Sequence, residues 1–277
     1  MFSRIALITL VFLTTPGAAA ETPSRIVSIN LCADQLLLAL ADRDQIVALS
    51  PYATDSAMSF FANEANNFRH DAGDAETVIG LHPDLVFAGR FTKRATRDLL
   101  TRLGYRVVLL DPARSIDQSI EQIREVAEIV GHPDRGEALV AVIEAARADA
   151  ALRAGAGFSA ALYQRRGYVT GGGTLTDDLM ATLQLTNAGG TLAGGTGGFV
   201  PLERIVAERP DVLVVQSAAP PADDQGSALL AHPALAALYP LSRRIVLPER
   251  LTVCGGPSLP EAFDWLADEV LRVQLAP

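Results

Sequence analysis

The sequence predicts an α/β protein whose two lobes are joined by one long helix and enclose a ligand cleft between them. Three observations predict this fold. Short apolar segments alternate with helical or turn-rich segments, one uninterrupted helical stretch lies near the middle of the chain, and one motif recurs on both sides of that stretch.

The first twenty residues have the pattern of a secretory signal peptide. A cation at Arg4 precedes the apolar run 5–13, and three alanines end at Ala20, where we expect cleavage. The run is far shorter than the roughly 20 apolar residues of a spanning helix. Leu31 before Cys32 is not the small residue that a lipoprotein signal requires. We therefore expect export to the periplasm without insertion into the membrane.

The composition excludes some classes of partner. The 277 residues carry a formal net charge of −9, whereas nucleic acids and anionic membranes both select cationic surfaces. The chain left after cleavage is long for one compact domain and suits two lobes. We expect a monomer that binds no nucleic acid.

The first lobe is expected to span residues 21–133. Its apolar runs are short, apolar on both faces and separated by helical or turn-rich segments, as in parallel strands that are covered on both sides. The expected strands are Arg25–Ile29, Gln45–Ser50, Leu85–Ala88 and Arg106–Leu110.

Two helices follow this lobe. Ser115 and Gln118 have the spacing of a capping box, and a helical stripe of isoleucine and valine continues to Ile129. A second helix is expected from Asp134 to about Leu152, and at roughly 1.5 Å per residue it spans nearly 30 Å. We interpret residues 134–154 as the connecting segment. The alternative is an ordinary crossover helix within one sheet.

The recurring motif supports a second lobe over residues 155–277. The segment Glu76–Val86 recurs as Glu203–Val214, with the glutamate, the apolar pair, the proline and the aspartate in register. Each copy predicts a short helix ended by proline, a turn at the aspartate and a buried strand. Because the copies flank the long helix, two similar lobes explain them most simply.

Taken together in this order, these segments resemble one known family, the periplasmic substrate-binding proteins of ABC importers for vitamin B12, iron siderophores and haem. In this family a single rigid helix joins two Rossmann-like lobes. The segments that carry the resemblance are Arg25-Ile-Val-Ser28, Glu76–Val86, Tyr168-Val-Thr-Gly171, Asn187-Ala-Gly-Gly190 and Glu203–Val214.

The resemblance implies a binding protein, not an enzyme. It would have no cofactor of its own, would capture a metal chelate (a corrinoid or a ferric siderophore) and would deliver it to a permease dimer with its ATPase. A haem ligand is the alternative within the family. The resemblance also places Glu76 and Glu203 where a glutamate on each lobe docks with the permease. The plain alternative is that both are ordinary acids at helix N-termini.

The resemblance also implies which residues meet the ligand. Tyr52 matches an aromatic position that contacts the ring system in B12-binding relatives, and His70 and Phe199 stand where those relatives carry tryptophan. His70 fits an ordinary surface histidine equally well. The sequence assigns no metal ligand. The full set of expected ligand-contacting residues is Cys32, Tyr52, His70, Arg90, Phe91, Gly172, Phe199 and Cys254.

The two cysteines leave three alternatives. In an oxidising compartment Cys32 and Cys254 form one disulfide by default. Cys32 follows the first predicted strand, and Cys254 lies in a loop before the last predicted helix. Both loops are expected to face the cleft, so a direct contact of the thiolates with a metal chelate is the second alternative. Two unpaired thiols are the third.

A periplasmic α/β hydrolase is the rival class. The sequence contains no Gly-x-Ser-x-Gly elbow and no His-Glu-x-x-His motif. The glycines 171–173 lack the lysine of a phosphate-binding loop, and a flexible turn that lets a ligand approach the backbone explains them better.

Overall fold

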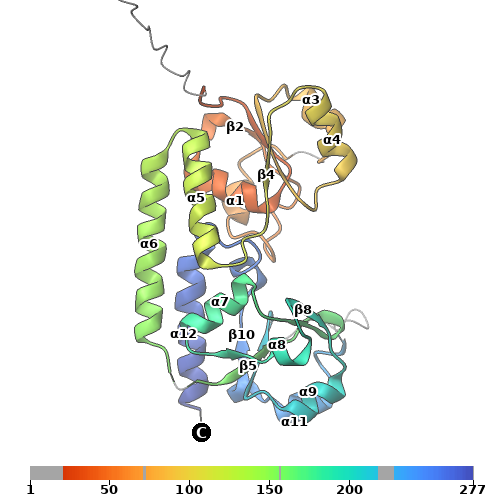
Figure 1. Cartoon of the computed structure of the whole chain (residues 1–277), viewed down its shortest axis with the longest axis vertical. Helices are drawn as coiled ribbons and strands as arrows, with labels where there is room; N and C mark the ends of the chain where they lie inside the picture. The colour runs from red at the N-terminus through yellow and green to blue at the C-terminus, as the bar shows by residue number, and fades with distance from the viewer. Residues whose placement is uncertain (1–20, 71–72, 156, 218–227, 277) are drawn as a thin grey trace, which may run out of the picture.

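The computed structural model describes residues 21–70, 73–155, 157–217 and 228–276. The expected signal peptide lies outside these residues. Two α/β lobes are stacked end to end, and long helices run along one side of both (Figure 1). Within the described part of the chain, no helix is both long enough and apolar enough to cross a membrane.

The first lobe contains a four-stranded parallel sheet in the order β2-β1-β3-β4. The expected strands are present; three of them are a residue or two shorter at an end than expected, and β3 extends one residue further, to Gly89. The strands are β1 (Ile26–Ser28), β2 (Ile46–Ala48), β3 (Leu85–Gly89) and β4 (Val107–Leu110). The helices and turns between them are α1 (Leu31–Leu40), η1 (Arg43–Gln45), α2 (Ala62–Ala65), α3 (Ala75–Gly80) and α4 (Arg94–Arg102).

Two long helices leave this lobe, α5 (Ile116–Val130) and α6 (Pro133–Leu152). The Ser115 hydroxyl caps α5 by accepting from the Gln118 backbone N–H at 3.0 Å. The Gln118 side chain accepts from the Arg114 N–H instead of the Ser115 N–H, so the expected capping box is only half formed. The second helix follows after a left-handed turn at Gly131, which has φ 84°.

The second lobe contains a four-stranded parallel sheet in the order β10-β9-β5-β7 and an antiparallel pair, β6 and β8, which the sequence did not predict. The strands are β5 (Ser159–Leu162), β6 (Tyr168–Thr170), β7 (Thr186–Asn187), β8 (Gly197–Phe199), β9 (Val212–Val215) and β10 (Arg244–Val246). The helices and turns are η2 (Arg165–Gly167), α7 (Leu175–Thr182), α8 (Gly189–Leu192), α9 (Leu202–Glu208), α11 (Pro233–Leu238), η3 (Leu241–Arg243), η4 (Glu249–Leu251), η5 (Gly256–Ser258) and α12 (Leu259–Gln274).

The last helix, α12, packs along α6, so the side of the molecule that joins the lobes has more than one helix (Figure 1). Arg153 at the end of α6 forms ion pairs with Asp264 and Asp268 of α12. The connecting helix is therefore held against the second lobe by charge as well as by packing.

The sequence repeat corresponds to a structural repeat. Asp84, before β3, accepts hydrogen bonds from the backbone and hydroxyl of Ser24, just before β1. Asp211, before β9, accepts the same two bonds from Ser159 at the start of β5. The residues that precede the two prolines, His82 and Arg209, both have φ 48°. The aspartate of each copy thus ties its own strand to the neighbouring strand of its sheet.

Candidate functional site

A pocket of about 460 Å³ lies at the carboxyl ends of β1, β2 and β3. This is the edge at which parallel sheets form ligand sites. All of its lining residues belong to the first lobe, and Cys32, next to the lining residue Leu31, is bonded to Cys254 of the second lobe. Its lining comprises Ile29, Asn30, Leu31, Pro51, Tyr52, Met58, Gly73, Phe91, Thr92 and Lys93.

The pocket wall is built by local contacts after β1 and β3. Asn30 caps α1, since its side-chain oxygen accepts from the Ala33 N–H at 3.0 Å. Gly89 ends β3 so close to Asn30 that a Cβ atom there would lie 2.3 Å from the Asn30 amide nitrogen. Glycine at position 89 therefore allows the cap residue and the next strand to share this edge.

Two of the expected ligand contacts, Tyr52 and Phe91, line this pocket with large exposed fractions. The exposed fraction is 55% for Tyr52 and 83% for Phe91. Single exposed apolar residues are common, but two exposed aromatic side chains around one concave site are typical of ligand-binding surfaces. Arg90, next to Phe91, is paired with Asp111 at 3.0 Å and does not line the pocket.

The second lobe presents Phe199 and Gly172 separately from this pocket. Phe199 is 71% exposed and packs edge-to-face on Tyr168, with ring centroids 5.5 Å apart. It lines a second pocket of about 510 Å³ that also includes Glu203. The Gly172 N–H donates to the Gly195 carbonyl at 2.9 Å, so this glycine ties the turn between β6 and α7 to the turn that precedes β8.

The lobes contact each other directly at several points. The Arg114 side chain donates to the carbonyl oxygen of Gly173 at 3.1 Å, and the Ile116 N–H donates to Asp178 at 2.8 Å. Cys32 and Cys254 form a disulfide with Cα atoms 5.1 Å apart. The structure thus contains the first of the three arrangements expected for the cysteines. Both sulfurs are used in the bond, so the alternative of thiolate contact with a chelate is not the arrangement found.

His70 lies on the rim of the first lobe and not in the pocket lining. Its backbone pairs with Leu49 in an isolated parallel bridge after β2, and its side chain is exposed. The structure therefore fits the surface alternative for this histidine. Among the residues that the structure describes, no group of three or more His, Cys, Asp or Glu side chains could hold a metal ion.

Of the lining residues, only Tyr52 and Phe91 are in the expected set, and Met58, Thr92 and Lys93 are among those that sequence reasoning missed. Met58 lies in an irregular segment with no periodic signal. The other two directly follow Phe91, so extending the expected site past the end of β3 could have found them.

Beneath the pocket, α1 carries two buried polar side chains that sequence reasoning also missed. Asp34 is fully buried, and this desolvation raises the pKa of its carboxyl group to about 7, although hydrogen bonds from Ser28 and Ser50 oppose the rise. Gln35 is also fully buried, and neither of its amide atoms has a hydrogen-bond partner within the described chain. A largely apolar helix thus carries two adjacent polar side chains into the interior of the first lobe.

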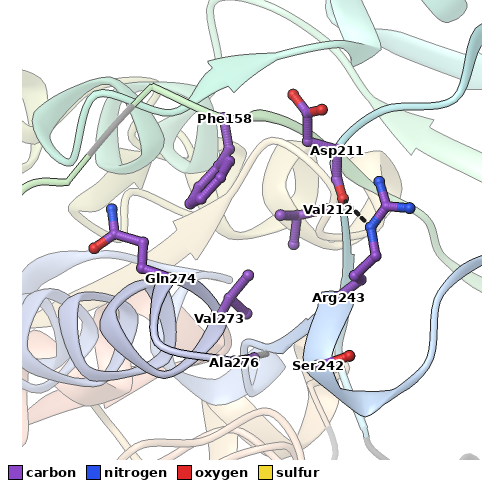
Figure 2. Close-up of a pocket in the computed structure, with 8 residues that line it drawn as sticks. All are labelled: Phe158, Asp211, Val212, Ser242, Arg243, Val273, Gln274 and Ala276. Atoms are coloured by element: carbon purple, nitrogen blue, oxygen red, sulfur yellow. Dashed lines mark hydrogen bonds between the residues drawn. The ribbon is translucent and has the colours of Figure 1, made fainter.

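Another pocket, of about 370 Å³, lies at the far end of the second lobe (Figure 2). Arg243 donates to the carbonyl oxygen of Asp211 there at 3.1 Å, and Phe158 and Val273 form apolar walls. It opens beside Asp211 and Val212, at the amino end of β9, away from the edge where open sheets place ligands. We therefore do not assign the ligand site to it.

Glu76 and Glu203 are both exposed in the first turns of their helices, α3 and α9. These helices belong to different lobes, yet they lie on the same side of the molecule, opposite α6 (Figure 1).

Two lobes with parallel sheets, a connecting helix and a pocket at the carboxyl ends of the strands define a two-lobe ligand-binding protein. The sequence profile of the family described as "Periplasmic binding protein" matches residues 26–240. The chain belongs to this family, which comprises substrate-binding transport proteins and not enzymes, so the expected class is confirmed.

Known proteins similar to this chain differ in what they bind. A cobalamin-binding protein of Halobacterium salinarum is 28% identical over 215 residues, which span 76% of this chain but only 58% of the relative. A periplasmic haem-binding protein of a Roseiflexus species has a TM-score of 0.71 at 24% identity, covering 90% of this chain and 97% of its own. A periplasmic vitamin B12 binding protein of Vibrio cholerae has a TM-score of 0.70 at 16% identity, covering 92% and 99%.

Proposed function

We propose that this protein captures a metal chelate in the periplasm and delivers it to an ABC importer. The observation that carries the proposal is the pocket at the carboxyl ends of β1, β2 and β3, where Tyr52 and Phe91 leave wide aromatic faces exposed. Such faces suit the flat apolar surface of a macrocycle or an aromatic chelator.

A corrinoid is the first candidate ligand. It is supported by the cobalamin-binding relative, whose similarity covers most of this chain. A ferric siderophore is the second candidate, supported by Lys93 at the pocket, because an ammonium group attracts an anionic chelate.

Haem is the alternative ligand, and one feature of the pocket favours it. The Tyr52 phenol and the Met58 thioether both line the pocket, and both groups can act as axial ligands of haem iron. The sequence expectation named Tyr52 alone. If either group binds iron, that iron would be part of the transported haem, because the protein is proposed to hold no cofactor of its own.

Delivery would use Glu76 and Glu203. Both side chains are exposed, and the helices that carry them, α3 and α9, lie on one side of the molecule, one in each lobe (Figure 1). Negative charge in the first turn of a helix is favoured by the helix dipole and remains available to cations of a partner. We assign the two glutamates to docking on the permease dimer.

Absorption spectroscopy tests the ligand proposal. The purified mature protein would be titrated separately with cyanocobalamin, hemin and a ferric hydroxamate, and each titration would be followed by the chelate's own visible bands. Saturable one-to-one binding of one chelate, with a dissociation constant of about 1 μM or tighter, is expected. Absence of binding for all three would overturn the proposal.

A further inference from the structure

The disulfide joins the two lobes beside the candidate pocket. Cys32 is in the first turn of α1, directly after the lining residue Leu31, and Cys254 lies between η4 and η5 of the second lobe. The bonded residues are 222 positions apart. The bond therefore fixes a wall of the pocket to the other lobe.

The segment around Cys254 also makes noncovalent contacts with the first lobe. The Gly256 N–H donates to the buried hydroxyl of Ser119 on α5 at 2.6 Å. Nearby, the Arg250 guanidinium lies 5.9 Å from the centre of the Phe60 ring. The segment 249–258 thus extends from the second lobe onto the first.

The path of this segment depends on glycine. Gly255 and Gly256 have φ angles of 75° and 68°. A Cβ atom at position 255 would lie 2.9 Å from the Ser119 hydroxyl oxygen. The chain turns here in a backbone conformation that other residues rarely adopt, and α12 begins directly afterwards at Leu259.

A second covalent connection changes how the lobes can move. A single helix, α6, would leave the lobes free to bend and twist about one connection. The disulfide adds a connection at the pocket itself, so bending about α6 cannot separate Leu31 from the segment 249–258. Without the disulfide, only noncovalent contacts would resist that separation.

We propose that Cys32 and Cys254 are positioning residues for ligand capture, because their disulfide holds the segment 249–258 against α1 beside the candidate pocket. Loss of the bond should loosen this segment and weaken ligand binding while both sheets stay folded. The statement about ligand affinity rests on the proposed function, whereas the statement about the segment does not.

The experiment compares three states of the mature protein: oxidised wild type, wild type treated with dithiothreitol, and the C32S/C254S variant. Dithiothreitol gives two electrons and two protons to the sulfurs and becomes its own cyclic disulfide. Amide hydrogen exchange, read by peptide mass spectrometry, reports each segment separately. Titration with cyanocobalamin, hemin and a ferric hydroxamate reports affinity.

Amides of residues 252–258 and of the first turn of α1 are expected to exchange at least tenfold faster in the reduced protein and in C32S/C254S, corresponding to about 1.4 kcal/mol of local opening. Exchange in β1, β3 and β9 should not change. The chelate that the oxidised protein binds should bind about tenfold more weakly. Dithiothreitol should have no further effect on C32S/C254S.

Ser119→Ala is the matched control, because it removes a noncovalent tie and keeps the disulfide. In this variant, amide hydrogen exchange should become faster at Gly256 and should stay unchanged in α1. Unchanged exchange in the reduced protein would overturn the proposal, and so would general loss of protection in both sheets. If oxidised protein binds none of the chelates, the proposed function fails, and the exchange comparison still decides the role of the disulfide.

Discussion

Asp34 on α1 and Ser50 after β2 are joined by two hydrogen bonds inside the first lobe. The Ser50 N–H and hydroxyl donate to the two carboxylate oxygens at 3.1 and 2.5 Å. The Ser28 hydroxyl, which also contacts Asp34, donates to the Asn30 carbonyl oxygen at 3.0 Å. Burial of the Asp34 carboxyl outweighs its hydrogen bonds with Ser28 and Ser50 and raises its pKa to about 7.

This carboxyl group should make stability depend on pH. Its pKa in the folded state, about 7, lies above the ordinary value of 3.8, so between these values the folded protein holds a proton that the unfolded chain has lost. The Asp34 contribution to the unfolding free energy therefore falls as pH rises through this window, by up to roughly 4 kcal/mol. Asp34→Asn should gain stability relative to wild type between pH 4.5 and 8.

Urea unfolding at pH 4.5, 6 and 8 measures this difference. Asparagine can keep both bonds to Ser50, accepting one and donating the other, so the variant should still fold. Asp44→Asn, at an exposed position of η1, is the control and should follow wild type at every pH. If the difference in unfolding free energy between Asp34→Asn and wild type is the same at all three pH values, Asp34 does not titrate in this window.

The aromatic faces of the pocket should contribute directly to ligand affinity. Tyr52→Ala and Phe91→Ala are each expected to weaken chelate binding about tenfold, since each removes an aromatic contact of roughly 1 to 1.5 kcal/mol. Visible-band titration measures both constants. Leu152→Ala, at the exposed end of α6, should leave affinity unchanged. Equal affinities in all four proteins would place the ligand elsewhere.

The docking assignment predicts a separation between binding and transport. Changing Glu76 and Glu203 together to alanine should alter chelate affinity by less than about twofold, because charges at a rim act on the partner and not on the pocket. Stimulation of the importer's ATPase in reconstituted vesicles should be lost. The matched control replaces Glu128 and Glu144, exposed on α5 and α6, and should stimulate normally. Full stimulation by the Glu76/Glu203 variant would refute the assignment.

Reduction of the disulfide should lower the melting temperature with or without ligand. The bond closes a span of 222 positions, for which chain entropy gives about 5 kcal/mol as an upper estimate. For a chain of this size that amounts to a decrease of up to about 10 to 20 °C. Calorimetry with and without dithiothreitol measures the change, and C32S/C254S, which should not respond to the reductant, is the control. A melting temperature that dithiothreitol leaves unchanged in wild type would show that the bond adds no stability.

Local patterns in the sequence were sufficient for the arrangement of the lobes. Apolar runs such as Leu85–Ala88 predicted buried strands because a strand covered on both faces needs apolar side chains throughout. The copies that begin at Glu76 and Glu203 predicted equivalent helix-turn-strand units, and Asp84 and Asp211 make equivalent bonds in the structure. Residue type and spacing encode such features within a few turns of chain.

The tertiary structure alone decided how distant residues meet. Compartment and composition left three alternatives for Cys32 and Cys254, and only the path of the segment 249–258 onto α1 brings their sulfurs together. Buried Asp34 likewise accepts its hydrogen bonds from Ser50, which follows a different strand. Such contacts form between segments that have no common period in the sequence, so they are determined by packing of the whole chain and not by any local pattern.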